Sequence, residues 1–189
     1  VSVNTTRAVP VAREFKKNKI ERYFGNITFA DGYKLGVHPK KENEQFLLAD
    51  GKPFSNPPFQ TLCPELAASG GEYFQKHVAG YLEDRIFKQD LGEHLLVNWE
   101  PYMFNGKGCF CPRCRKAFAS FMGMKEAELE KYWPDEIFSR YEIPFRDFRS
   151  EQHARLVLRI QETLNALAKK YGRKECSFIP EISLASLFL

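Results

Sequence analysis

The chain has 189 residues, and 43% of them are hydrophobic, including 17 Phe and 8 Tyr. That length suits one domain, and so much apolar surface excludes a disordered chain. The net charge is only +4, with 28 basic and 24 acidic residues spread along the sequence, which argues against a nucleic-acid partner. Since no run of about 18 apolar residues and no signal peptide occurs, we expect no membrane partner and favour a cytoplasmic location.

The first half of the chain shows two helical patterns and one strong strand pattern. Apolar residues at helical spacing, followed by Gly25, predict a helix over residues 11–24. Residues 26–58 contain many Gly and Pro residues and predict a strand followed by a long loop. An apolar stripe over residues 71–87 indicates a packed helix, and the apolar run 94–99 is typical of a buried parallel strand.

The second half continues the alternation of helices and strands. Two short helices are predicted over residues 112–122 and 125–132, and a long helix over residues 150–171 with Ser150 as N-cap. Residues 176–182 return to strand. This order favours an α/β fold with parallel strands. Because no Gly-rich phosphate-binding turn occurs, a (β/α)8 TIM-barrel type is predicted in preference to a doubly wound sheet.

Four cysteines give the strongest chemical signal in the sequence. Cys109, Cys111 and Cys114 form a C-x-C-x2-C run, and Cys63 adds a distant fourth thiol. Zinc prefers four such soft ligands in a tetrahedron, and four protein ligands leave no open position, so a structural Zn²⁺ is expected. Disulfides, an iron–sulfur cluster and free core cysteines are the alternatives; the tight spacing and the odd total of five cysteines fit full pairing poorly. Cys176 is expected to be a buried apolar side chain. Nearby basic residues would offset the charge of the thiolates: Lys107, Arg113, Arg115 and Lys116.

Glu100 directly follows the predicted strand over residues 94–99. In a barrel, catalytic groups project from the C-terminal ends of the strands. The flanking aromatic residues Trp99 and Tyr102 would desolvate this carboxyl and raise its pKa, as a general acid at neutral pH requires. A structural glutamate bound to an arginine is the alternative. Glycoside hydrolysis needs a second carboxylate, and Glu181 near the end of the next strand is the other carboxylate in a comparable setting.

These motifs together resemble the central part of the catalytic barrel of glycoside hydrolase family forty-two, the β-galactosidases. In that family the acid/base glutamate is followed about nine residues on by a zinc-binding C-x-C-x2-C run, and a further cysteine ligand lies in the preceding loop. Here Glu100 precedes Cys109 by nine positions, and Cys63 lies 46 positions before Cys109. Residues 131–150 also resemble the family's tryptophan-rich segment and the start of its long helix. The resemblance covers roughly residues 57–173.

The resemblance implies a retaining glycoside hydrolase with Glu100 as general acid/base, acting on a carbohydrate that Asn98, Trp99 and Tyr102 would contact. The family's Asn-Glu pair is replaced by Trp99-Glu100, so Asn98 is the neighbouring residue that could supply the amide. The chain would be a single domain, residues 1–189, covering about strands three to five of an incomplete barrel. The nucleophile would lie outside this chain, which alone would be inactive. Open strand edges would favour association with a second copy. The alternative is a non-catalytic, zinc-stabilised binding or scaffold domain.

Overall fold

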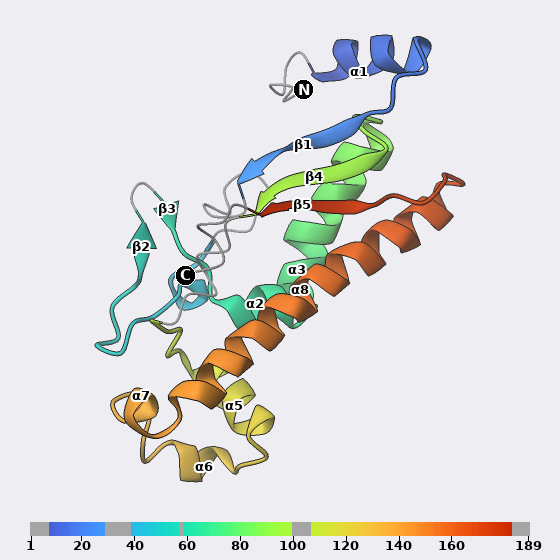
Figure 1. Cartoon of the computed structure of the whole chain (residues 1–189). Coiled ribbons are helices and arrows are strands. Elements are labelled where there is room, and N and C mark those ends of the chain that lie inside the picture. Colours follow the sequence, from blue (N-terminus) through green and yellow to red (C-terminus); the bar gives the residue numbers. More distant parts are fainter. Residues whose placement is uncertain (1–7, 29–38, 57–58, 100–106, 183–189) are drawn as a thin grey trace.

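A parallel sheet of three strands lies in the upper part of the view in Figure 1. The computed structural model describes residues 8–28, 39–56, 59–99 and 107–182. The strands are β1 (Tyr23–Thr28), β4 (His94–Trp99) and β5 (Phe178–Ile182), in the order β1-β4-β5. Leu95 of β4 pairs with Phe178, and Asn98 pairs with Glu181. The carboxyl ends of β4 and β5 therefore meet at one edge of the sheet, and the strand predicted over residues 94–99 is confirmed.

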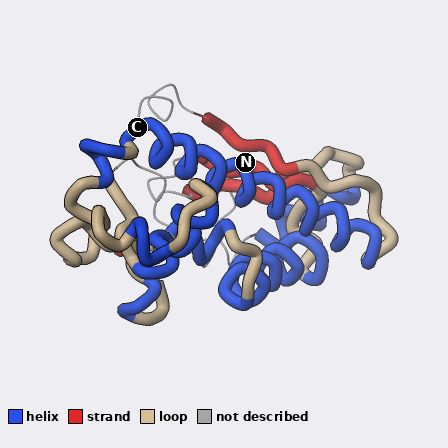
Figure 2. Tube along the Cα trace, turned by 90° about the horizontal axis from the view of Figure 1, so that it is seen from below, coloured by secondary structure: helices blue, strands red, loops and turns tan. Residues whose placement is uncertain are grey.

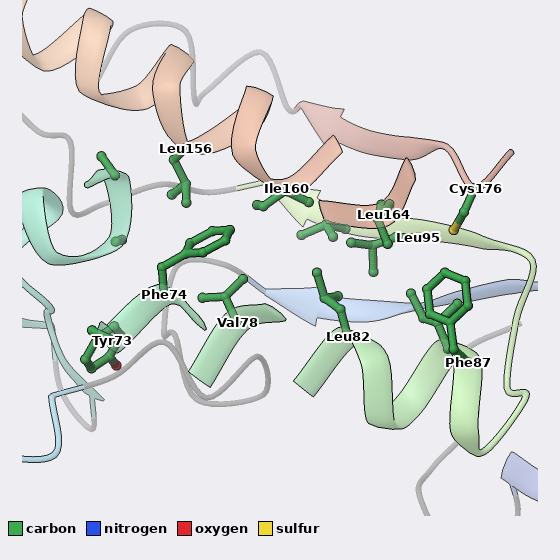
Figure 3. Close-up of a cluster of buried hydrophobic side chains, with 14 of the residues drawn as sticks. Tyr73, Phe74, Val78, Leu82, Phe87, Leu95, Leu156, Ile160, Leu164 and Cys176 are labelled. Carbon is green, nitrogen blue, oxygen red and sulfur yellow. The ribbon is translucent and has the colours of Figure 1, made fainter. Parts of the chain in front are cut away.

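Helices cover one face of this sheet (Figures 1 and 2). One runs over residues 72–88 as α3 (Glu72–Phe74), the π-helical turn η2 (Gln75–Ala79), α4 (Gly80–Leu82) and the π-helical turn η3 (Glu83–Lys88). The other is α8 (Glu142–Lys170), which is 29 residues long. Their apolar stripes pack against alternate residues of β4, and Figure 3 shows Leu82, Ile160 and Leu164 facing Leu95. Cys176 is buried in the same cluster, as predicted.

The remaining elements are short. They comprise α1 (Ala8–Lys17), the 3-10 turn η1 (Glu42–Glu44), the hairpin β2 (Ser55–Asn56) and β3 (Phe59–Gln60), α2 (Pro64–Ala68), α5 (Pro112–Phe121), α6 (Glu126–Leu129) and α7 (Ile137–Arg140). Proline stands in the first turn of α2 and of α5, where its missing N–H costs nothing. None of the described helices is both long and apolar enough to cross a membrane.

The prediction of a TIM barrel is wrong. Most of the described secondary structure is helical, and the described parallel strands form a small open sheet rather than a closed ring. A barrel requires eight strands whose tilt and stagger close the sheet on itself. Apolar periodicity reports only which faces of a helix or strand are buried, so it cannot report whether a sheet closes.

Two helix boundaries also differ from prediction. The first helix ends at Lys17 rather than at residue 24, because Lys19 has a left-handed backbone with φ of 57° and β1 begins soon after. The long helix begins at Glu142, eight residues before the predicted Ser150 cap. Ser150 lies inside α8, and its hydroxyl donates to the carbonyl of Arg146 at 3.2 Å. Serine can bond back along a helix in this way, so it is an ambiguous start signal.

Candidate metal centre

The four cysteines predicted as ligands come together in space. Their sulfur atoms all lie within 4.8 Å of one another. The Sγ atom of Cys63 lies 3.4 Å from that of Cys111 and 3.6 Å from that of Cys114. A Zn–S bond of about 2.3 Å puts the sulfurs of a tetrahedral site about 3.8 Å apart. A disulfide would need sulfurs about 2.05 Å apart, and all four residues are free thiols. The cluster can therefore hold a metal ion.

Two helix starts and one loop present these sulfurs. Cys63 immediately precedes α2, and Cys111 immediately precedes α5. Cys114 lies one turn further along α5, three residues after Cys111, and so on the same side of that helix. Cys109 comes from the segment that leads into α5. All four side chains are at most 2% exposed, so solvent does not compete for a bound ion.

The electrostatics of the cluster divide the sulfurs into two kinds. Burial raises the pKa of Cys63 and of Cys109. Hydrogen bonding to Cys109 lowers the pKa of Cys111. Burial opposes ionisation of Cys114 as well, but hydrogen bonds from the other three cysteines and the charge of Arg149 bring its pKa well below the usual range. Without a metal, thiols and thiolates share protons, and a cation must displace those protons when it binds.

An apolar and backbone shell encloses Cys109. The backbone N–H of Leu47 donates to the Cys109 Sγ atom at 3.2 Å, and the N–H of Phe110 donates to the Leu47 carbonyl at 2.8 Å. Phe46 is fully buried beside the cysteines. A Cβ atom at Gly108 would lie only 2.6 Å from the Phe46 ring, so this close packing requires glycine. Residues 45–47 thus form one wall of the site.

Of the basic residues expected near the sulfurs, Arg113 interacts with the cysteines. Arg115 pairs with Glu126 and Glu130 at 3.1 and 2.7 Å. Burial alone would lower the pKa of Arg113, but its interactions with the sulfurs of Cys63, Cys111 and Cys114 produce a net rise. Lys107 and Lys116 are exposed.

Sequence reasoning missed Arg149, whose Nη1 atom lies 3.6 Å from the Cys114 Sγ atom. The available signal was a break in the apolar stripe of the long helix. Arg149 and Gln152 occupy positions of that stripe between Phe148 and Leu156, and both are buried. A buried polar residue needs a partner. These two positions therefore indicated that polar groups of another segment pack against this side of the helix.

The predicted catalytic residues fall largely outside this centre. Glu100 and Tyr102 lie outside the described residues. Asn98 and Trp99 belong to β4, where their backbones pair with Glu181 and Ile182 of β5. Their predicted contacts with a carbohydrate stay predictions.

Comparison with models of known protein families, with curated proteins and with solved structures finds no match for this chain. The resemblance to glycoside hydrolase family forty-two therefore stays an interpretation of the sequence.

Proposed function

We propose that Cys63, Cys109, Cys111 and Cys114 bind one Zn²⁺ ion whose role is structural. The observation that carries this proposal is the convergence of four buried sulfurs within 4.8 Å of one another. Thiolates are the soft ligands that zinc prefers, and a complete set of four protein ligands leaves no position for water or substrate. The sulfurs leave room for one ion, whereas an iron–sulfur cluster would hold them further apart.

The proposed ion joins two regions that are distant in the sequence. It links the start of α2, through Cys63, to the segment that follows β4, through Cys109, and to α5, through Cys111 and Cys114. These elements are too short to be stable alone, since isolated helices below about 12–15 residues are marginal. The free energy of binding structural zinc, about 10–16 kcal/mol in small zinc domains at pH 7, would contribute to folding of this region.

Metal content of the reduced protein tests the proposal, and the fifth cysteine supplies a matched control. We expect one zinc per chain by elemental analysis in the wild type and in Cys176→Ala, because Cys176 is buried in the apolar cluster away from the site. Cys114→Ala is expected to lose the metal. Absence of stoichiometric metal from the reduced wild type, or equal metal content in the two alanine variants, would contradict the proposal.

We propose as a second candidate that the chain belongs to a retaining glycoside hydrolase in which Glu100 is the general acid/base and the nucleophile lies outside this chain. The register of the sheet supports it, since Asn98 pairs with Glu181 at the carboxyl ends of adjacent parallel strands. Glu100 follows Asn98 by two positions. Polar groups at such an edge are typical of ligand sites in parallel sheets. The proposed zinc would brace the segment that carries Glu100 without joining the chemistry.

The second candidate requires a longer protein that supplies the nucleophile, and the kinetics of such a protein test it. Glu100→Ala is expected to slow hydrolysis of an aryl β-galactoside with a poor leaving group by about 10²–10⁴-fold, the usual contribution of a general acid. With an aryl β-galactoside whose leaving group departs without protonation, azide should restore turnover by replacing water in the second step and give the glycosyl azide. Glu175→Ala, at an exposed residue, should behave as wild type. Stoichiometric zinc in a wild type that neither hydrolyses nor binds carbohydrate would instead favour the scaffold alternative.

A further inference from the structure

A chain of buried polar side chains leads away from the sulfur cluster along α8. Arg149 is 3% exposed and Gln152 is fully buried, and they are the buried polar residues of this helix. Burying a charged group is costly unless it is paired and hydrogen-bonded. The partners of these two side chains therefore show what they contribute.

The guanidinium of Arg149 contacts two of the four proposed ligands. Its Nη2 atom donates to the carbonyl of Cys109 at 2.8 Å, and its Nη1 atom faces the Cys114 Sγ atom at 3.6 Å. The same group lies over the rings of Phe145 and Phe148, at 4.6 and 5.1 Å from their centroids. Two donors and two aromatic contacts fix the position of this cation against the sulfurs.

Gln152 connects this cation to the other ligand-bearing segment. Its side-chain oxygen accepts a hydrogen bond from Arg149, and its side-chain nitrogen donates to the carboxylate of Glu65. Glu65 lies in α2, two residues after Cys63, and also accepts from Arg155 at 3.2 Å. The oxygen of the Gln152 amide meets a donor and its nitrogen meets an acceptor, so this amide has one favourable orientation. The path joins the region of Cys109 and Cys114 to that of Cys63 through α8.

Charge gives this path a role beyond packing. Four thiolates around one divalent cation leave a net negative charge, and burial makes that charge costly. The fixed positive charge of Arg149, 3.6 Å from the Cys114 sulfur, offsets it where solvent cannot. Side chains that hydrogen-bond to ligands in this way tune both the affinity of a site and the electronic state of its metal.

We propose that Arg149 is a positioning residue of the metal centre, which compensates the charge of the thiolates and holds Cys109 and Cys114 in place, with Gln152 and Glu65 orienting its guanidinium. The proposal rests on the structural metal site proposed above. It adds that α8, which supplies no ligand, is an integral part of that site. A metal titration of side-chain variants of α8 therefore tests it.

The experiment compares Arg149→Met with Arg155→Met in the chain as it stands, using Co²⁺ as a spectroscopic probe and Zn²⁺ competition with a chelator. Both variants remove an arginine from α8 that reaches the same polar path, but Arg155 contacts Glu65 and no proposed ligand. Arg149→Met should raise the Kd for Zn²⁺ by about 10–100-fold and Arg155→Met by no more than about threefold. Loss of the cation should also move the sulfur-to-cobalt charge-transfer band to lower energy in Arg149→Met alone, a shift that general destabilisation would not cause.

Each outcome decides one of the two proposals. If the wild type binds no stoichiometric Zn²⁺ or Co²⁺, the proposal of a metal site is itself wrong. A wild type that binds metal, together with equal Kd values and bands for the two variants, overturns the role of Arg149 alone. If Arg149→Met does not fold, Arg149→Lys decides, because lysine keeps the charge but cannot reach two acceptors. A Kd raised by about tenfold supports the positioning role, with a band that stays near its wild-type energy because the charge is kept, whereas a wild-type Kd overturns that role.

Discussion

Two regions of the molecule are held together by different means. The sheet half consists of β1, β4, β5, residues 72–88 and residues 156–170 of α8. Its core is a continuous cluster of buried aliphatic and aromatic side chains between long helices and the parallel strands. The metal half consists of residues 39–61, Cys63 and residues 107–149, and it contains two-residue strands, short helices, the cysteine cluster and a group of packed aromatic rings. Long elements can bury enough apolar surface to be stable, whereas short ones need a cross-link.

Helix α8 is the one described element that runs through both halves (Figure 1). Its first turns pack Phe145 and Phe148 among the aromatic rings, and its later turns pack Leu156 and Ile160 on the sheet. Between them lies the buried polar path of Arg149 and Gln152. Because the two cores have no buried residue in common, each half can be perturbed separately.

Removal of the metal is expected to have the largest effect, and that effect should be confined to the metal half. In the reduced protein, a strong chelator or Cys114→Ala should expose the amides of α5 and of residues 45–47 to hydrogen exchange. Amides of β4 and of the later turns of α8 should stay protected, because their apolar core remains. Mass-spectrometric exchange with and without chelator measures this. Equal loss of protection in both halves would show that the metal supports the whole fold, and no loss would show that it supports neither.

Shortening a buried side chain in the sheet half is expected to destabilise the fold and to leave metal binding unchanged. Leu164 is fully buried, and Leu164→Ala should lower the free energy of unfolding by about 2–5 kcal/mol. The same substitution at Leu158, which is 61% exposed on the same helix, should change it by no more than about 0.5 kcal/mol. Urea unfolding of the zinc-loaded protein measures both. The Kd for Zn²⁺ should stay unchanged in Leu164→Ala, and a weakened Kd would mean that the halves are strongly coupled.

A smaller effect is expected from Gly108→Ala at the wall of the metal site. The added Cβ would lie 2.6 Å from the Phe46 ring and 2.8 Å from the Leu47 carbonyl, and the N–H of Leu47 is a donor to Cys109. Overpacking of this kind costs about 1–3 kcal/mol. Gly71→Ala is the matched control, since its Cβ would meet only Ser69 at 3.5 Å. Metal competition should show weaker binding in Gly108→Ala alone; equal affinities would mean that the wall can shift at no cost to the site.

The same contrast explains what the sequence could predict. Local signals succeeded: the apolar run of β4 and the spacing of Cys109, Cys111 and Cys114 each report on neighbouring residues. Of the relations between distant residues, only the place of Cys63 beside the other cysteines was predicted correctly. Nothing in the periodicity shows whether a sheet closes, so the barrel was wrong. Arg149 lies 35 positions from the cysteine that it contacts, and only the polar break in an apolar stripe pointed to it. Ser150 looked like a helix start because serine bonds to the backbone both at helix ends and within helices.

The smallest expected effect is a pH dependence that originates on α8 between the two halves. Burial lowers the pKa of His153, which follows Gln152 directly. The folded chain therefore resists protonation at this residue, while the unfolded chain takes up a proton as pH falls through about 6.5. Stability rises with pH wherever the unfolded state binds more protons. The free energy of unfolding should accordingly decrease from pH 7 to pH 5.

Replacement of His153 by glutamine removes that contribution and should flatten the slope. Urea midpoints of the zinc-loaded wild type and of His153→Gln, taken at intervals from pH 5 to pH 8, measure the difference. Any loss of zinc at low pH affects both proteins and cancels in the comparison. His153 lies beside the polar path and before the apolar turns of α8. A smaller dependence of the free energy of unfolding on pH in His153→Gln would show that this part of α8 unfolds together with the two halves. Parallel slopes would mean that His153 is protonated as readily in the folded chain as in the unfolded one.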